Sequence, residues 1–73
     1  MPAPQQVLGK RIRHLREQRG WTQEDLGRKA RKHPTYIGGI ERGERNATVQ
    51  VLADISKALG ISIADLFTGD SGQ

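Results

Sequence analysis

Two histidines, His14 and His33, are the side chains of this chain best suited to act as a general base or a metal ligand at neutral pH. Neither stands at a spacing from carboxylates that is typical of a metal site or a catalytic base, and the chain has no cysteine. With 73 residues, the chain is also too short for a large catalytic cleft or a Ser-His-Asp triad. We therefore assign no catalytic residue, no metal and no cofactor.

A second set of polar groups lies along residues 34–42, where we expect a helix. With about 100° of rotation per residue, one side of this helix is largely apolar and is expected to pack, whereas the other is small or basic and is expected to be displayed. The packing side comprises Tyr36, Ile37, Ile40 and Glu41, and the displayed side comprises Thr35, Gly38, Gly39 and Arg42. A displayed hydroxyl and guanidinium suit hydrogen bonding to a polyanion.

Basic residues outnumber acidic ones and are unevenly placed. Twelve Lys and Arg against eight Asp and Glu give a formal net charge of +4, which favours a polyanionic partner but is shared by many ordinary proteins. All the basic residues except Lys57 precede residue 46. We therefore expect the first part of the chain to face phosphates.

The spacing of apolar residues and the helix-end signals predict five helices and no strand. We expect them at residues 6–19, 23–30, 34–42 and 49–59, with a short fifth helix that contains Ile63, Leu66 and Phe67. The capping signals are Thr22 with Asp25, His33 before Pro34, Thr48, and Ser62 with Asp65, and the stop signals are Gly20 and Gly60. In the fourth helix, the expected apolar face comprises Val49, Leu52, Ile55 and Leu59.

These helices predict a single domain over residues 6–67, with flexible ends at residues 1–5 and 68–73. No segment approaches the roughly 20 apolar residues that cross a bilayer, and residues 1–6 lack the apolar core of an export signal. We therefore expect no membrane partner and a cytoplasmic location.

The second and third helices, joined by a short turn at residues 31–33, form the pattern of a helix-turn-helix, whose second helix lies in the DNA major groove. Gly38 and Gly39 each cost about 1 kcal/mol of helix propensity relative to alanine, so something else must favour them. Their bare surface could let DNA approach the helix backbone closely, leaving Thr35 and Arg42 to make side-chain contacts. The alternative is that both glycines are neutral surface residues.

The segment TQEDLGRKARKHPTYIGGIERGERN (residues 22–46), followed by LADISKALGISIADLF (residues 52–67), resembles the Cro/C1-type, or XRE, family of helix-turn-helix repressors. Within that family, TYIGGIERGERN is most similar to the controller proteins of restriction-modification systems. The resemblance covers about residues 8–67. It implies an all-α, compact five-helix domain similar to that of lambda repressor.

The resemblance also assigns roles to residues. Gln23 matches a family glutamine that contacts a phosphate, and Thr35 is the one residue at the family's base-reading positions whose side chain can hydrogen-bond a base. Pro34 departs from the polar residue often found at its position, and Tyr36 is expected to pack with a solvated hydroxyl. The predicted DNA-binding residues are Gln23, His33, Pro34, Thr35, Tyr36, Gly39, Arg42, Arg45 and Asn46.

Arg16 and Glu41 match a buried ion pair of the family, so Arg16 is expected to be structural despite its charge. Such a pair adds little net stability, but removing one partner strands the other charge at a cost of about 3 to 5 kcal/mol. Trp21 and Phe67 are expected to be core or partner-facing aromatic residues.

Regulators of this size usually bind as dimers to two-fold operators whose half-sites lie one helical turn apart. The end of the chain is rich in apolar residues, which either form a homodimer interface or close the core. The expected interface residues are Leu59, Ile61, Ile63, Leu66 and Phe67.

The sequence therefore predicts a homodimeric transcription regulator whose partner is double-stranded operator DNA, with no small-molecule ligand. Two alternatives stay open. An antitoxin-like, protein-binding module is disfavoured by the short tail after Phe67, and a DNA-anchoring domain of a longer protein is disfavoured by the Met start and polar end of the chain.

Overall fold

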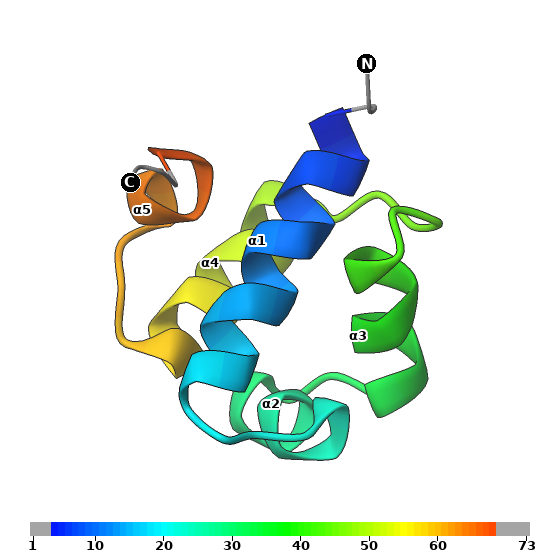
Figure 1. The fold of residues 1–73 in the computed structure, drawn as a ribbon, viewed down its shortest axis with the longest axis vertical. Coiled ribbons are helices and arrows are strands. Elements are labelled where there is room, and N and C mark those ends of the chain that lie inside the picture. The colour runs from blue at the N-terminus through cyan, green and yellow to red at the C-terminus, as the bar shows by residue number, and fades with distance from the viewer. Residues whose placement is uncertain (1–3, 69–73) are drawn as a thin grey trace.

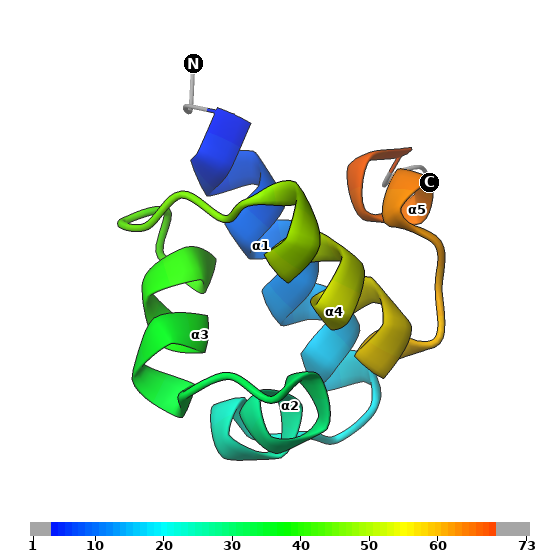
Figure 2. The same ribbon diagram turned by 180° about the vertical axis from the view of Figure 1, so that it is seen from behind.

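A computed structural model of the chain describes residues 4–68 and shows five helices connected by short loops (Figures 1 and 2). The helices are α1 (Pro4–Gln18), α2 (Gln23–Ala30), α3 (Pro34–Glu41), α4 (Val49–Leu59) and α5 (Ile63–Thr68). No strand occurs within these residues. Helix α1 packs against α3 and α5, α2 packs against α3 and α4, and α4 packs against α5. The expected all-α, five-helix architecture is confirmed.

The ends of three helices differ slightly from the expected ones. Helix α1 begins at Pro4 rather than at residue 6, because proline suits the first turn of a helix and Gln5 Nε2 donates to Gly43 O at 2.8 Å. Helix α3 ends at Glu41, and α5 extends to Thr68. Residues 4, 5 and 68, which the sequence analysis placed in flexible ends, therefore lie in helices, and the other residues of those ends lie outside the described part.

The capping groups predicted from the sequence are in place. At α2, Thr22 Oγ1 accepts from the Asp25 backbone N–H at 3.0 Å, and the Asp25 carboxylate accepts from the Thr22 N–H at 2.8 Å. Ser62 and Asp65 form the same reciprocal pair at α5. At α3, His33 Nδ1 accepts from a backbone N–H at 3.0 Å. Each cap satisfies amide groups that a helix start leaves without a partner.

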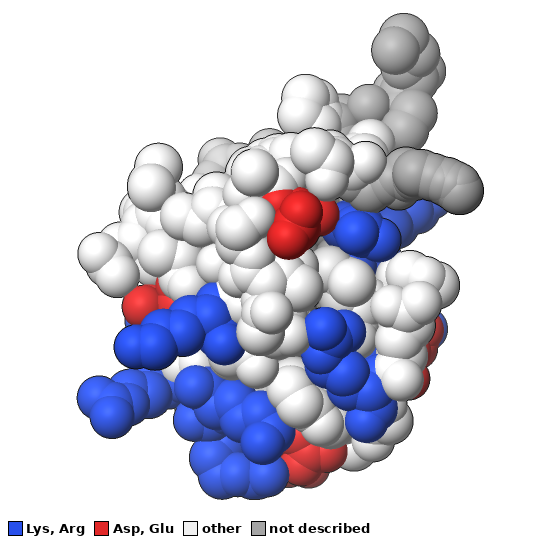
Figure 3. Space-filling view, turned by 90° about the vertical axis from the view of Figure 1, so that its left-hand side faces the viewer, with Lys and Arg blue, Asp and Glu red and all other residues white. Residues whose placement is uncertain are grey.

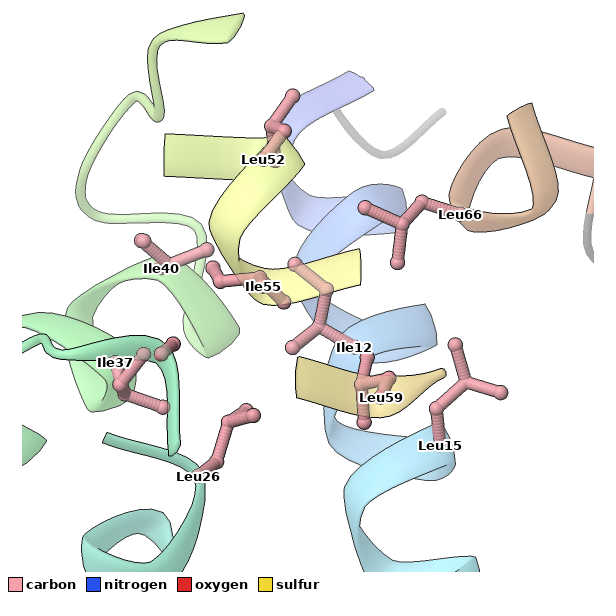
Figure 4. Close-up of a cluster of buried hydrophobic side chains, with 10 residues drawn as sticks. Ile12, Leu15, Leu26, Ile37, Ile40, Leu52, Ile55, Leu59 and Leu66 are labelled. Carbon is pink, nitrogen blue, oxygen red and sulfur yellow. The ribbon is translucent and has the colours of Figure 1, made fainter. Parts of the chain in front are cut away.

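The core lies between the helices and is formed by aliphatic side chains from all five of them (Figure 4). The buried apolar residues are Ile12, Leu15, Leu26, Ala30, Ile37, Ile40, Leu52, Ile55, Leu59 and Leu66. Val49 is 75% exposed, so its expected place on the buried face of α4 is wrong. It is the first residue of that helix, where the surrounding helices no longer cover the apolar face.

Helices α1 and α3 cross in close contact at Gly9. A Cβ atom at this buried glycine would overlap the backbone oxygens of Ile40 and Glu41. Because backbone atoms cannot move aside as a flexible side chain can, glycine is required for this approach. The crossing holds the end of α3 against α1.

Within residues 4–68, every helix is too short or too polar to span a bilayer.

Candidate nucleic-acid interface

The turn between α2 and α3 fixes the angle between the two helices. Helix α2 ends at Ala30 and is capped by Arg31, whose left-handed backbone (φ 59°) is unusual for a residue with a side chain. The Lys32 N–H donates to Gly27 O at 2.7 Å, which closes the last turn of α2. A Cβ at Gly27 would overlap Lys32 O, so this glycine permits the tight turn that brings Pro34 to the start of α3.

The side of α3 that the sequence predicts to be displayed is only partly exposed. Thr35 and Arg42 are exposed as expected, but Gly38 and Gly39 are buried, so the prediction is wrong for both glycines. The reason is that longer side chains from other elements lie across them. A rotation of about 100° per residue describes α3 alone and takes no account of these neighbours.

Three side chains cover the two glycines. A Cβ atom at Gly38 would lie 3.0 Å from Arg42 Nη1 and 3.1 Å from Gln23 Oε1. At Gly39, a Cβ would lie 2.8 Å from Arg45 Cγ. The polar groups over the centre of α3 therefore belong to α2 and to the residues that follow α3.

The expected ion pair between Arg16 and Glu41 is confirmed. Arg16 Nε donates to Glu41 Oε2 at 2.7 Å and Arg16 Nη2 donates to Glu41 Oε1 at 3.0 Å, and the two side chains are 9% and 2% exposed. Arg16 Nη1 also donates to Trp21 O at 2.7 Å. The hydrogen bond to Glu41 raises the pKa of Arg16 above its usual value. The pair joins α1, the start of α2 and the end of α3, so Arg16 is structural.

Gln23, the first residue of α2, belongs to the same network. Its Nε2 donates to Glu41 Oε1 at 3.1 Å, and the side chain is half-buried. Sequence reasoning placed Gln23 and Glu41 in separate roles and missed this contact. A signal that could have revealed this contact is that a buried carboxylate needs hydrogen-bond donors in addition to one guanidinium group.

The segment after α3 carries the other predicted polar residues. The Tyr36 hydroxyl donates to Asn46 O at 3.4 Å. The Arg45 guanidinium lies 5.9 Å from the centre of the half-buried Tyr36 ring. These contacts agree with the expectation that the ring packs and the hydroxyl is solvated. Arg42 pairs with Glu44 at 3.0 Å, and this hydrogen bond lowers the pKa of Glu44. Together with Glu44, the residues Tyr36, Arg45 and Asn46 line an open hollow of about 590 Å³.

Basic side chains are not confined to the neighbourhood of α3. Figure 3 shows the side of the molecule turned away from α3, and Lys and Arg gather over its lower part. Some arginines are also tied to the fold, since Arg19 Nη2 donates to Leu59 O at 2.7 Å. Basic side chains therefore lie on more than one side of the molecule, and the expectation that the first part of the chain faces phosphates stays a prediction. Among residues 4–68, no cluster of His, Asp and Glu is arranged to hold a metal.

The predicted dimer interface needs a correction. Leu59 and Leu66 are 3% and 1% exposed within a single chain, so they close the core and do not reach a partner. Ile61 and Ile63 are half-buried, and Phe67 is 61% exposed. Two further exposed apolar residues, absent from the prediction, are Val7 and Val49. They lie on the starts of α1 and α4, which are at the same end of the molecule as α5 (Figures 1 and 2).

Comparison with known proteins identifies the class. The helix-turn-helix family matches residues 12–66, which is most of the chain. The chain therefore belongs to the helix-turn-helix family, and the resemblance to its Cro/C1-type members is confirmed.

Among its relatives are controller proteins of restriction-modification systems. Control protein C.SmaI from Serratia marcescens is 38% identical over 63 residues, which cover 86% of this chain and 75% of the relative. The crystal structure of controller protein C.AhdI from Aeromonas hydrophila superimposes with a TM-score of 0.85 at 35% identity, over 86% of this chain and 96% of that protein. Controller protein C.Esp1396I, solved as a tetramer with its natural 35 base-pair operator, gives a TM-score of 0.82 at 37% identity, over 92% of this chain and 88% of that protein.

Proposed function

We propose that this chain is a transcription regulator that binds a two-fold operator in double-stranded DNA as a homodimer, with α3 in the major groove. The observation that carries the proposal is the α2–α3 unit, which the Arg16–Glu41 pair joins to α1 and which exposes Thr35 and Arg42. The operator complex of C.Esp1396I supports it, because that protein shares the fold at 37% identity. We expect the protein in the bacterial cytoplasm, associated with the nucleoid when bound to DNA.

Most of the proposed contacts are to the DNA backbone. Arg42, Arg45 and Asn46 are exposed, and both guanidinium groups are on flexible side chains that can turn toward phosphates. Gln23 lies at the start of α2, where the helix dipole and free amides favour a phosphate. Thr35 is the residue that we expect to contact a base edge, because His33 is occupied as the helix cap and Pro34 has no donor.

The proposed dimer interface is the apolar end of the molecule. Phe67, Ile61 and Ile63 remain from the sequence prediction, and Val49 adds to them because its side chain is 75% exposed. A two-fold axis at this end would pair identical surfaces and would place two copies of α3 on successive major grooves.

Selection of bound sequences from a random duplex pool at near-physiological salt, with the stoichiometry of the selected complex, tests the proposal. We expect recovery of a two-fold symmetric site that binds two chains or a multiple of two. Weak binding without sequence preference would contradict the proposal and would point to a protein partner instead.

A further inference from the structure

A hollow of about 330 Å³ lies between α1 and the end of α3, beside the surface already proposed to bind DNA. Its lining residues are Gln6, Lys10, Arg13, Glu41 and Arg42. Three of them carry a positive charge, and the one carboxylate, Glu41, is buried and paired with Arg16. The hollow is therefore cationic, and its two basic residues on α1 are absent from the predicted DNA-binding residues.

Contacts in the first turns of α1 fix the two walls of the hollow relative to each other. Gln5 Nε2 donates to Gly43 O at 2.8 Å, and Gly9 allows α1 to approach the backbone of α3 closely (Figure 1). Because Gly43 directly follows Arg42, these contacts hold α1 beside Arg42. Lys10, which follows Gly9, thereby shares the hollow with Arg42.

The basic side chains on α1 are available to a ligand. Lys10 is exposed, and none of the ion pairs within residues 4–68 includes it. Arg13 is also exposed, and its pair with Glu17 at 3.2 Å is open to solvent and costs little to break. Glu41 already accepts hydrogen bonds from two other side chains, so it does not occupy Lys10.

The chemistry of the hollow fits a phosphodiester group. Ammonium and guanidinium groups only donate hydrogen bonds, and a phosphate only accepts them. Besides lining the hollow, Arg42 lies with its Nη1 over Gly38, close to Gln23, so the hollow continues the row of groups proposed to contact the DNA backbone. A DNA strand carries one phosphate about every 3.4 Å of helix axis, so a strand bound at Arg42 brings further phosphates past α1.

We propose that this hollow is a further phosphate-binding site of the DNA interface, in which Lys10, flanked by Arg13 and Arg42, binds the backbone of the operator. The site reads no base, because a phosphate is the same at every base pair. The inference rests on the proposed function for its DNA partner, whereas the cationic hollow exists in the free protein. The alternative is a solvated basic face that DNA does not contact.

The test compares Lys10→Ala with Lys57→Ala, each on the operator recovered by selection and on a random duplex of the same length. Lys57 is the matched control: it is also exposed and its loss changes the net charge equally, but it lines a separate hollow between α2 and α4. Both changes are on the surface and should preserve the fold, which circular dichroism checks. Titration of labelled DNA at several salt concentrations measures the affinity.

Lys10→Ala is expected to weaken operator binding about tenfold at low salt, the effect of one hydrogen bond to a charged group. It should also make the log-log slope of affinity against salt less steep by about 0.9, because the complex neutralises one phosphate fewer. The random duplex should show the same two changes. Lys10→Arg keeps the positive charge and should retain both the affinity and the slope.

Unchanged affinity and slope for Lys10→Ala on both duplexes would overturn the inference. An equal loss from Lys57→Ala would also overturn it, because that result would show a general effect of net charge. The random duplex separates these outcomes from the proposed function. If the wild type binds the random duplex as tightly as any selected site, the proposed function is contradicted, whereas the effect of Lys10→Ala on that binding still decides the phosphate site.

Discussion

At the scale of single residues, the two glycines of α3 have two competing explanations. They either allow DNA to approach the helix backbone or leave room for the Gln23 and Arg45 side chains to pack on it. The structure supports the packing explanation, because both glycines are buried beneath those side chains in the free protein. The two explanations differ in what an added methyl group does when the covering side chain is removed.

Gly39→Ala separates them. The new Cβ would lie 2.8 Å from Arg45 Cγ, and this flexible side chain can move, so the fold should persist and gain up to about 1 kcal/mol from helix propensity. Operator affinity should fall because Arg45 is displaced. In an Arg45→Ala background, the packing explanation predicts no further loss of operator affinity from Gly39→Ala. Titration of labelled operator measures this affinity. A persistent loss in that background would support close approach of DNA.

Glu41→Ala tests the buried pair on its own. It leaves the Arg16 guanidinium, now 9% exposed, without its carboxylate, and we expect the free energy of unfolding to fall by about 3 to 5 kcal/mol. Urea unfolding followed by circular dichroism measures the change. The exposed pair of Arg13 and Glu17 provides the control, since Glu17→Ala should cost no more than about 1 kcal/mol. Equal stability of Glu41→Ala and wild type would show that the pair is not buried in solution.

At the scale of elements, the contact between α1 and α3 depends on Gly9. Gly9→Ala would push a methyl group into the backbone of α3, and overpacking of this kind costs about 1 to 3 kcal/mol. The exposed neighbour Lys10→Ala is the control and should change stability little. Thermal unfolding of both variants measures the difference. Gly9→Ala with the stability of the control would mean that the helices are farther apart.

The cap of α2 makes stability depend on pH. The Asp25 carboxylate accepts hydrogen bonds from the Thr22 backbone N–H and from Arg28. The Thr22 bond, with a smaller contribution from Arg28, holds the pKa of Asp25 below its usual value of 3.8. A carboxyl group with a lowered folded-state pKa stabilises the fold above its unfolded-state pKa, and this contribution is lost as the pH falls through the folded-state pKa. Asp25→Asn should therefore lower the urea midpoint at neutral pH, and the difference from wild type should shrink below pH 3.8. A difference that is constant with pH would exclude the carboxylate as its source.

Helix caps and helix order could be predicted from the sequence because they depend on residues a few positions apart. Thr22 with Asp25 and Ser62 with Asp65 carry their full signal within one turn. The burial of Gly38 could not be predicted in this way, since it depends on the reach of Gln23 from another helix. The resemblance to a family, rather than spacing, supplied the Arg16–Glu41 pair.

At the scale of the whole molecule, the same limit applies to the proposed dimer. Counting apolar residues at the end of the chain does not separate those that close the core from those that remain exposed. Leu66 and Phe67 are adjacent in sequence, yet they are 1% and 61% exposed, because a helix turns successive side chains to different sides. The exposed members alone are available to a second copy.

Phe67→Asp should therefore abolish the dimer without unfolding the chain, because its side chain is largely exposed in the single chain and a charge at an apolar two-fold interface meets its own copy. Leu66→Asp is the matched control and should unfold the protein, since it places a charge in the core. Sedimentation measures the mass, and circular dichroism measures the helix content. The Phe67→Asp monomer should still bind a half-site, but weakly, because a single domain contacts few base pairs. A folded Phe67→Asp variant that remains dimeric would show that Phe67 is not part of the interface.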